Sequence, residues 1–246
     1  MTLHERSGAT DTHPAARPAP LGWLRAALAD RESLRTWTVI ANDGIIATAG
    51  ILEGFAGAGA SDRTLITAAT TATIVGTLSV GGAEWAEAAA ERDGQLTAAD
   101  EEAAEIASQP DVEHAEVVAY YEAKGLTPQL AREVADQLMA HDALDAQLES
   151  EHGILGIVSR AETVRAGIGS AIAYLLGAAI PLIITAVVPA ATESWLILVA
   201  VFISLIITSS IGARTGRMNL PRTLARALAV GLGTMAVSYL VGSLIF

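Results

Sequence analysis

Five apolar stretches, each close to or longer than a membrane-crossing helix, dominate this chain. A helix needs about 20 mostly apolar residues to cross a hydrocarbon core about 30 Å thick. The chain is 52% hydrophobic with a mean hydropathy of +0.43, which is rare for a water-soluble domain. We therefore predict an all-α, polytopic membrane protein with five transmembrane helices. They cover residues 37–60, 64–88, 166–189, 193–213 and 223–246.

The first apolar stretch contains two carboxylates, Asp43 and Glu53. An ionised side chain at the bilayer centre costs roughly 2.5–3.5 kcal/mol, so such residues commonly mark an ion or proton pathway. The two are about 15 Å apart along a helix, so they cannot both lie at the same membrane interface. The alternative for Asp43 is a hydrated position near one interface. Glu84 and Glu87 lie where the second stretch should leave the membrane, although its helix could also continue into water.

Arginines mark alternate sides of the predicted spans. They precede the first and third spans and separate the fourth from the fifth, whereas the other loops are almost free of them. Short loops rich in Lys and Arg stay in the cytoplasm. We therefore expect a cytoplasmic N-terminus and an external C-terminus, an asymmetry that five spans require. The arginines are Arg25, Arg31, Arg35, Arg160, Arg165, Arg214, Arg217, Arg222 and Arg226.

The sequence divides into five regions. Residues 1–20 are proline-rich without an apolar run, which is typical of a disordered tail rather than a cleavable signal. Residues 21–35 predict an amphipathic interfacial helix with Trp23 at the headgroups, the alternative being a plain linker. Transmembrane helices 1–2 then occupy 36–90, a cytoplasmic acidic helical domain occupies 91–160, and transmembrane helices 3–5 occupy 161–246.

The acidity of the chain is concentrated in the insertion between spans two and three. Residues 91–152 hold 16 acidic and three basic residues, a net charge of −13, while the whole chain carries −12. Helix signals divide this insertion: a start at Thr97, a break at Pro110 with Asp111 as cap, and an end at Gly125. Thr127 and Pro128 open another helix to about residue 140, and a last helix runs to residue 153. A common apolar face is predicted for Val117, Leu126, Leu130, Val134, Leu138 and Leu148.

Acidic residues in the insertion are spaced as metal ligands on helices often are. Glu102 with Glu105, and Glu113 with Glu116, are i,i+3 pairs whose like charges a bound cation would relieve. Glu151 could complete the shell, with His114, Glu149 and His152 nearby in sequence. The alternative is a solvated acidic surface. Because the chain has no cysteine, thiolate centres are excluded, and the carboxylates suit Mn²⁺, Fe²⁺, Mg²⁺ or Ca²⁺.

Several short motifs follow one another in order along residues 36–246. They are Asp43-Gly44-Ile45-Ile46, the glycine-rich run 50–59, the run 76–84, Lys124-Gly125-Leu126-Thr127-Pro128, the run 177–182 and the run 238–244. As an ensemble these motifs resemble the vacuolar iron transporter (VIT) family. From this ensemble and from its 14 arginines to one lysine we identify the chain as a bacterial-type member.

The resemblance implies a homodimer that exchanges divalent iron, and sometimes manganese, for protons and moves metal out of the cytoplasm. It assigns Asp43 to the translocation path and to metal binding, and Glu84 to the inner end of span two. It assigns the ligands of a cytoplasmic metal-binding domain to Glu102, Glu105, Glu113, Glu116 and Glu151. Glu149, Met139 and His114 are weaker candidates from their positions in the insertion. Mn²⁺ or Zn²⁺ are alternative ions for that domain, and we expect no nucleic-acid partner.

Two departures from the family pattern concern thioether ligands. Val80 and Gln147 stand where the family commonly has methionine, which leaves the preference between Fe²⁺ and Mn²⁺ open because thioethers favour softer metals. Glu53 and Glu87 are candidates for the transport pathway from their positions alone. The host membrane is a bacterial plasma membrane or, in a eukaryote, a vacuolar membrane. We expect a secondary transporter and not an enzyme. The alternative function is a membrane-anchored iron sensor or store that oxidises iron at a carboxylate site without transport.

Overall fold

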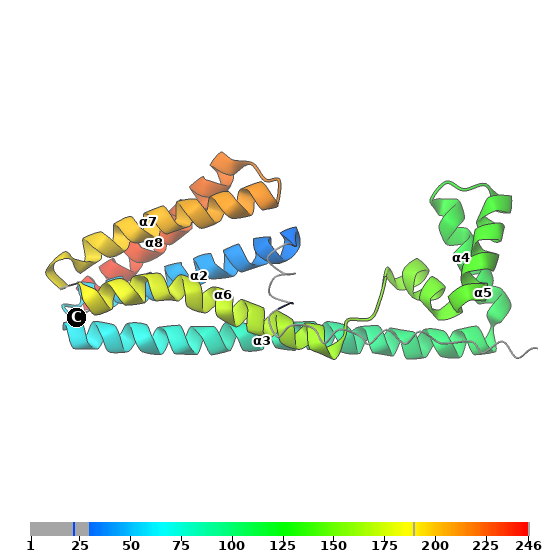
Figure 1. Ribbon diagram of the computed structural model, residues 1–246, viewed down its shortest axis with the longest axis horizontal. Coiled ribbons are helices and arrows are strands. Elements are labelled where there is room, and N and C mark those ends of the chain that lie inside the picture. The colour runs from blue at the N-terminus through cyan, green and yellow to red at the C-terminus, as the bar shows by residue number, and fades with distance from the viewer. Residues whose placement is uncertain (1–21, 23–29, 189, 246) are drawn as a thin grey trace, which may run out of the picture.

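The computed structural model describes residue 22, residues 30–188 and residues 190–245, and this part of the chain is helical without a strand. The predicted tail at 1–20 and most of the predicted interfacial helix at 21–35 lie outside the described residues. The helices are α2 (Arg31–Gly57), α3 (Asp62–Ser108), α4 (Pro110–Ala123), α5 (Pro128–His152), α6 (Arg160–Val187), α7 (Ala190–Thr215) and α8 (Leu220–Ile245) (Figure 1).

Five of these helices are long and apolar enough to cross a membrane, namely α2, α3, α6, α7 from Trp195, and α8. The prediction of an all-α protein with five membrane spans is therefore confirmed. The five helices form a bundle at one end of the molecule, while α3 continues beyond the bundle and carries α4 and α5 at its far end (Figure 1).

Helix α2 is the centre of the bundle, because it contacts α3, α6, α7 and α8. Its apolar side chains Ile45 and Leu52 are almost fully buried and pack with Leu65 of α3, Leu205 of α7 and Met235 of α8. The opposite faces of the outer helices expose large apolar side chains, as expected where lipid replaces water. The bundle thus places the first apolar stretch, with its two carboxylates, among all the other spans.

Small residues allow α2 to approach its neighbours closely. A Cβ atom added at Gly177 of α6 would lie 2.0 Å from the backbone oxygen of Ala41, and one added at Gly44 would lie 2.3 Å from the backbone oxygen of Tyr174. The absence of a side chain at Gly44 and Gly177 is therefore what allows this close helix packing. Gly59 has a different role: a Cβ there would meet nothing within 4 Å, and its φ of +72° serves the turn after α2.

Helix α3 is one continuous helix of 47 residues, about 70 Å long, that runs from the bundle into the insertion. The predicted helix start at Thr97 is therefore wrong. The Thr97 hydroxyl donates to the backbone oxygen of Asp93 at 3.0 Å, a bond within the helix, instead of capping a new one. The alternative that the helix of span two continues past residue 88 into the acidic segment is confirmed.

The insertion beyond α3 is a hairpin of α4 and α5. Pro110 is the first residue of α4 and Gln109 is its cap, so the predicted cap at Asp111 is wrong; Asp111 lies in the first turn, where its charge favours the helix dipole. Thr127 caps α5 through a hydrogen bond from the backbone nitrogen of Leu130, as predicted. The backbone of α5 kinks at Asp142, which agrees with the prediction of a separate last helix ending near residue 153.

The core of the hairpin differs in part from the predicted apolar face. Val117, Val118, Ala131 and Ala135 are buried together, with Leu126 packed against them. The predicted face was wrong in one respect, because Leu130 and Leu138 are exposed. The small side chains of Ala131 and Ala135 allow close contact between α4 and α5. Leu130 and Leu138 lie outside that contact.

Candidate metal site and transport pathway

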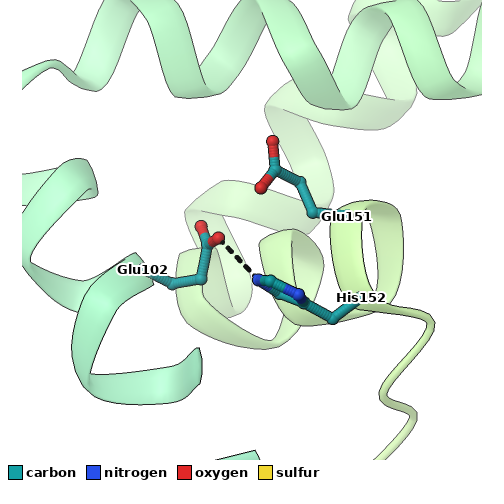
Figure 2. A group of neighbouring side chains, drawn as sticks. All are labelled: Glu102, Glu151 and His152. Atoms are coloured by element: carbon teal, nitrogen blue, oxygen red, sulfur yellow. Dashed lines mark hydrogen bonds and ion pairs between the residues drawn. The ribbon is translucent and has the colours of Figure 1, made fainter. Parts of the chain in front are cut away.

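Three helices bring acidic side chains together at the start of the insertion. Ligand atoms of Glu102 and Glu105 on α3 and Glu113 on α4 lie within 4.8 Å of one another. Ligand atoms of Glu102, Glu151 and His152 form a second such group, which joins α3 to the end of α5 (Figure 2). Glu102 belongs to both groups and links them.

Two of these carboxylates are buried, which is costly for a charge without compensation. Glu102 and Glu113 are each 2% exposed. Oε1 of Glu102 is 3.0 Å from Nε2 of His152, while its other oxygen, Oε2, is buried and has no hydrogen-bond partner among the described residues. A buried carboxylate oxygen without a donor is the group that a cation would satisfy.

Gln147 holds the second buried carboxylate. Its side chain is fully buried, and its Nε2 donates both to the backbone oxygen of Glu113 at 3.0 Å and to the carboxylate of Glu113. Its Oε1 accepts a hydrogen bond of 2.9 Å from the Ser150 hydroxyl. Every polar atom of the amide is thereby engaged, and the carboxylate of Glu113 is fixed in orientation.

The crowding of carboxylates raises the pKa values of two of them. A hydrogen bond with the Glu151 carboxyl, together with burial and the charges of Glu151, Glu113 and Glu102, raises the pKa of Glu116 to about 7. Burial raises the pKa of Glu102, and the hydrogen bond from His152 opposes this effect. Glu116 therefore joins the cluster through Glu151. Such a site favours either protons or a metal cation.

The weaker ligand candidates have other partners. Nε2 of His114 is 2.6 Å from Asp136, on the outer side of the hairpin where the carboxylate is exposed. Glu149 is 4.0 Å from Lys124, and Met139 packs against the apolar core of the hairpin. Of the two glutamates near the end of α5, Glu151 rather than Glu149 joins the carboxylate cluster.

The carboxylates of the bundle lie at successive levels along it. Gly44, next to Asp43, and Gly76 of α3 both lie against Tyr174, so Asp43 and Gly76 are level with each other. Glu84 lies about 12 Å from that level towards the insertion, and Glu53 lies about 15 Å away in the opposite direction. Because α2 and α3 run in opposite directions, Glu84 and Glu53 lie on opposite sides of the level of Asp43.

These bundle carboxylates differ in burial. Asp43 and Glu87 are exposed on the single chain, Glu84 is half-buried, and Glu53 is buried with 7% of its surface exposed. Asp43 belongs to a stripe of residues along α2 that are four positions apart, called here the Asp43 stripe. The large apolar residues of this stripe are also exposed, namely Val39, Ile51 and Phe55.

Two residues of the carboxylate cluster were not assigned as ligands from the sequence: Gln147 was noted only as a departure from the family pattern, and His152 only as a neighbour of Glu151. Gln147 is uncharged, so no charge pattern singles it out. His152 follows Glu151 directly, and adjacent residues on a helix normally face different directions; its position at the last residue of α5, before the left-handed Gly153, lets both side chains reach Glu102. Adjacent acidic and imidazole side chains at a helix end are the signal that could have identified it.

These features define a multi-pass α-helical membrane protein whose second span extends into an acidic insertion. A family model described as the VIT family matches residues 34–243, and the chain belongs to that family. It is 31% identical over 227 residues to a vacuolar iron transporter of Acanthamoeba castellanii, a match that covers 91% of this chain and 78% of the relative. The protein is accordingly a transporter rather than an enzyme, and metal ions are the class of substrate that the comparisons support.

Proposed function

We propose that the protein exports divalent iron from the cytoplasm in exchange for protons, with Mn²⁺ as an alternative substrate. The observation that carries this proposal is the order of the acidic groups: the cluster around Glu102, then Glu84, Asp43 and Glu53 along the bundle. The name of the Acanthamoeba castellanii relative supports iron as the cargo.

The insertion collects the cargo on the cytoplasmic side in this proposal. Its net charge of −13 attracts cations, because a field of one sign raises the local concentration of counter-ions. Metal then leaves the cluster for Glu84, which lies where α3 enters the bundle, and continues to Asp43. Arginines precede spans one, three and five. Because short loops rich in Lys and Arg stay in the cytoplasm, these arginines support a cytoplasmic location for the insertion.

Proton exchange follows from the chemistry of the same carboxylates. A carboxylate binds a divalent metal strongly only when it is deprotonated, so protonation from the outer side releases the metal and metal loading on the inner side releases the proton. Asp43 carries both ions in turn. Glu53, buried nearer the outer end, carries protons to and from that level.

A homodimer supports this path, because the Asp43 stripe of α2 is uncovered in a single chain. A carboxylate facing lipid is costly, whereas a second copy that covers Val39, Ile51 and Phe55 removes Asp43 from the lipid. The protein has no cysteine, so Ile51→Cys provides one reactive site. We expect rapid disulfide cross-linking of Ile51→Cys in membranes and none for Leu176→Cys on an exposed face of α6; equal cross-linking of both would contradict this dimer face.

Flux into proteoliposomes tests the transport proposal. Purified protein is reconstituted, a proton gradient is imposed, and uptake of Fe²⁺ under reducing conditions and of Mn²⁺ is followed. We expect Asp43→Asn to lower the initial rate about tenfold or more, as for the loss of a ligand. The control is Asp62→Asn, an exposed aspartate at the first residue of α3, which should retain the rate. An unchanged rate for Asp43→Asn would contradict the proposal.

A further inference from the structure

The chain contains two histidine–carboxylate pairs in the insertion that differ in what surrounds the carboxylate. His114 pairs with Asp136, and His152 pairs with Glu102; each imidazole side chain is 36% exposed. The side chain of Asp136 is 67% exposed, whereas the side chain of Glu102 is only 3% exposed. The first pair is an ordinary surface contact, and the second lies at the edge of a buried acidic cluster.

The surroundings of His152 contain the remaining donors of a metal site. Glu151 points its carboxylate towards Glu102 from the same side as the imidazole (Figure 2). The ligand atoms of these three residues lie within 4.8 Å of one another. Oε2 of Glu102 is buried and has no partner among the described residues, so the cluster holds an oxygen that still requires a cation or a donor.

The distance between His152 and Glu102 fits two neighbouring ligands of one ion. With metal–ligand bonds of about 2.1 Å, adjacent ligands are about 3.0 Å apart in octahedral geometry and about 3.4 Å apart in tetrahedral geometry. The separation of Nε2 and Oε1 is 3.0 Å. Without metal, Nε2 donates its proton to Glu102. The neutral imidazole with its proton on Nδ1 instead presents the Nε2 lone pair to an ion at this position.

We propose that His152 is a nitrogen ligand of the metal held by Glu102 and Glu151, and that it shifts the selectivity of the insertion towards borderline ions such as Zn²⁺, Co²⁺ and Fe²⁺ over Mn²⁺. Imidazole suits zinc and iron, whereas a site of carboxylate and water alone suits manganese, magnesium and calcium. This inference rests on the proposed function for its biological meaning, but its test measures binding rather than transport.

Isothermal titration of the purified full-length protein with Zn²⁺ and with Mn²⁺ tests the inference. We expect His152→Gln to weaken Zn²⁺ binding about tenfold or more and Mn²⁺ binding by less than about threefold. His114→Gln is the matched control, since its imidazole has the same exposure and also pairs with a carboxylate; it should leave both affinities unchanged. Equal losses of Zn²⁺ and Mn²⁺ affinity, or no loss, would overturn the inference.

A measurement on the unmodified protein removes any dependence on folding of the variant. Diethyl pyrocarbonate acylates accessible imidazole nitrogens, and mass spectrometry locates the product. We expect Zn²⁺ to protect His152 and to leave the labelling of His114 and His141 unchanged. Labelling of His152 at the same rate with and without Zn²⁺ would overturn the inference. If Zn²⁺ protects His152 but the protein moves no metal into proteoliposomes, the proposed function is contradicted and the inference is not. The two failures are therefore distinguishable.

Discussion

At the scale of single residues, uncharged groups hold one carboxylate of the acidic cluster in place. The carboxylate of Glu113 is buried, and Gln147 fixes it through one amide nitrogen while Ser150 fixes the amide oxygen. A carboxylate that is already oriented loses less entropy when it binds a metal, so the amide contributes to affinity without touching the ion.

Gln147→Leu removes this support while preserving most of the side-chain volume. We expect the metal affinity of the insertion to fall about tenfold to a hundredfold, the usual effect of losing a group that orients a ligand. Titration calorimetry with Mn²⁺ and Zn²⁺ measures the change. Gln137→Leu is the control, because Gln137 is exposed on the same helix. If both variants bind metal as the unmodified protein does, Gln147 does not orient the site.

The raised pKa of Glu116 predicts how the metal-free protein responds to pH. Its pKa is about 7 in the folded protein against an ordinary value of 4.5, so the folded state binds the proton more tightly than the unfolded state. The stabilisation is complete below about pH 4.5 and is lost as the pH rises through about 7. We expect the melting temperature of the metal-free protein to decrease as the pH rises from about 5 to about 8.

Glu116→Gln should remove most of this pH dependence, whereas Glu122→Gln, an exposed glutamate on the same helix, should retain it. Saturating metal should reverse the trend, because the deprotonated cluster then binds the cation. Thermal unfolding followed by circular dichroism measures all three proteins. A Glu116→Gln profile identical to that of the unmodified protein would show that this carboxyl is not the proton-binding group.

At this scale, the glutamates of the site were the residues that the sequence could predict, because their charge pattern is visible in it. The i,i+3 spacing predicted that Glu102 and Glu105 lie together, and the structure brings Glu113 to them across the α3–α4 turn. Gln147 and His152 could not be assigned in the same way, because their direction depends on the kink at Asp142 and on the helix end at Gly153. Tertiary geometry, rather than residue type, determines which neighbours reach the cluster.

At the scale of elements, α3 is the part that joins the bundle to the insertion. Thr97 and the acidic pair after it are typical of a helix start, yet the helix continues, because Thr97 can bond within the helix and no proline or glycine-rich segment interrupts it until Pro110. One continuous helix therefore spans both regions.

Close helix packing in the bundle predicts a sharp response to one methyl group. In Gly177→Ala the new Cβ would lie 2.0 Å from the backbone oxygen of Ala41, so α6 and α2 must separate. We expect a loss of about 1–3 kcal/mol in stability, as for overpacking elsewhere. The melting temperature in detergent measures it. Gly82→Ala, where nothing lies within 4 Å, should be neutral or slightly stabilising; equal melting temperatures for the two variants would contradict the packing described.

At the scale of the whole molecule, the number and type of the spans follow from apolar length alone, since a bilayer demands helices of about 20 apolar residues. The arrangement around α2 does not follow from length, because it depends on which small residues meet, such as Gly44 and Gly177. The sequence also identifies Asp43 and Glu53 as exceptional, while their levels relative to Glu84 emerge only from the packing of α2 and α3 against α6. That series of carboxylates is the basis of the proposed export pathway.

Simultaneous recording of metal and proton movement in sealed proteoliposomes tests this account most directly. Reconstituted protein is given Fe²⁺ under reducing conditions on one side, without an imposed pH gradient, and an internal metal indicator and a pH indicator are read together. The account predicts that metal entry is accompanied by proton movement in the opposite direction, and that both signals are lost in Asp43→Asn. Metal binding to the vesicles without entry, or metal entry without any proton movement, would contradict it.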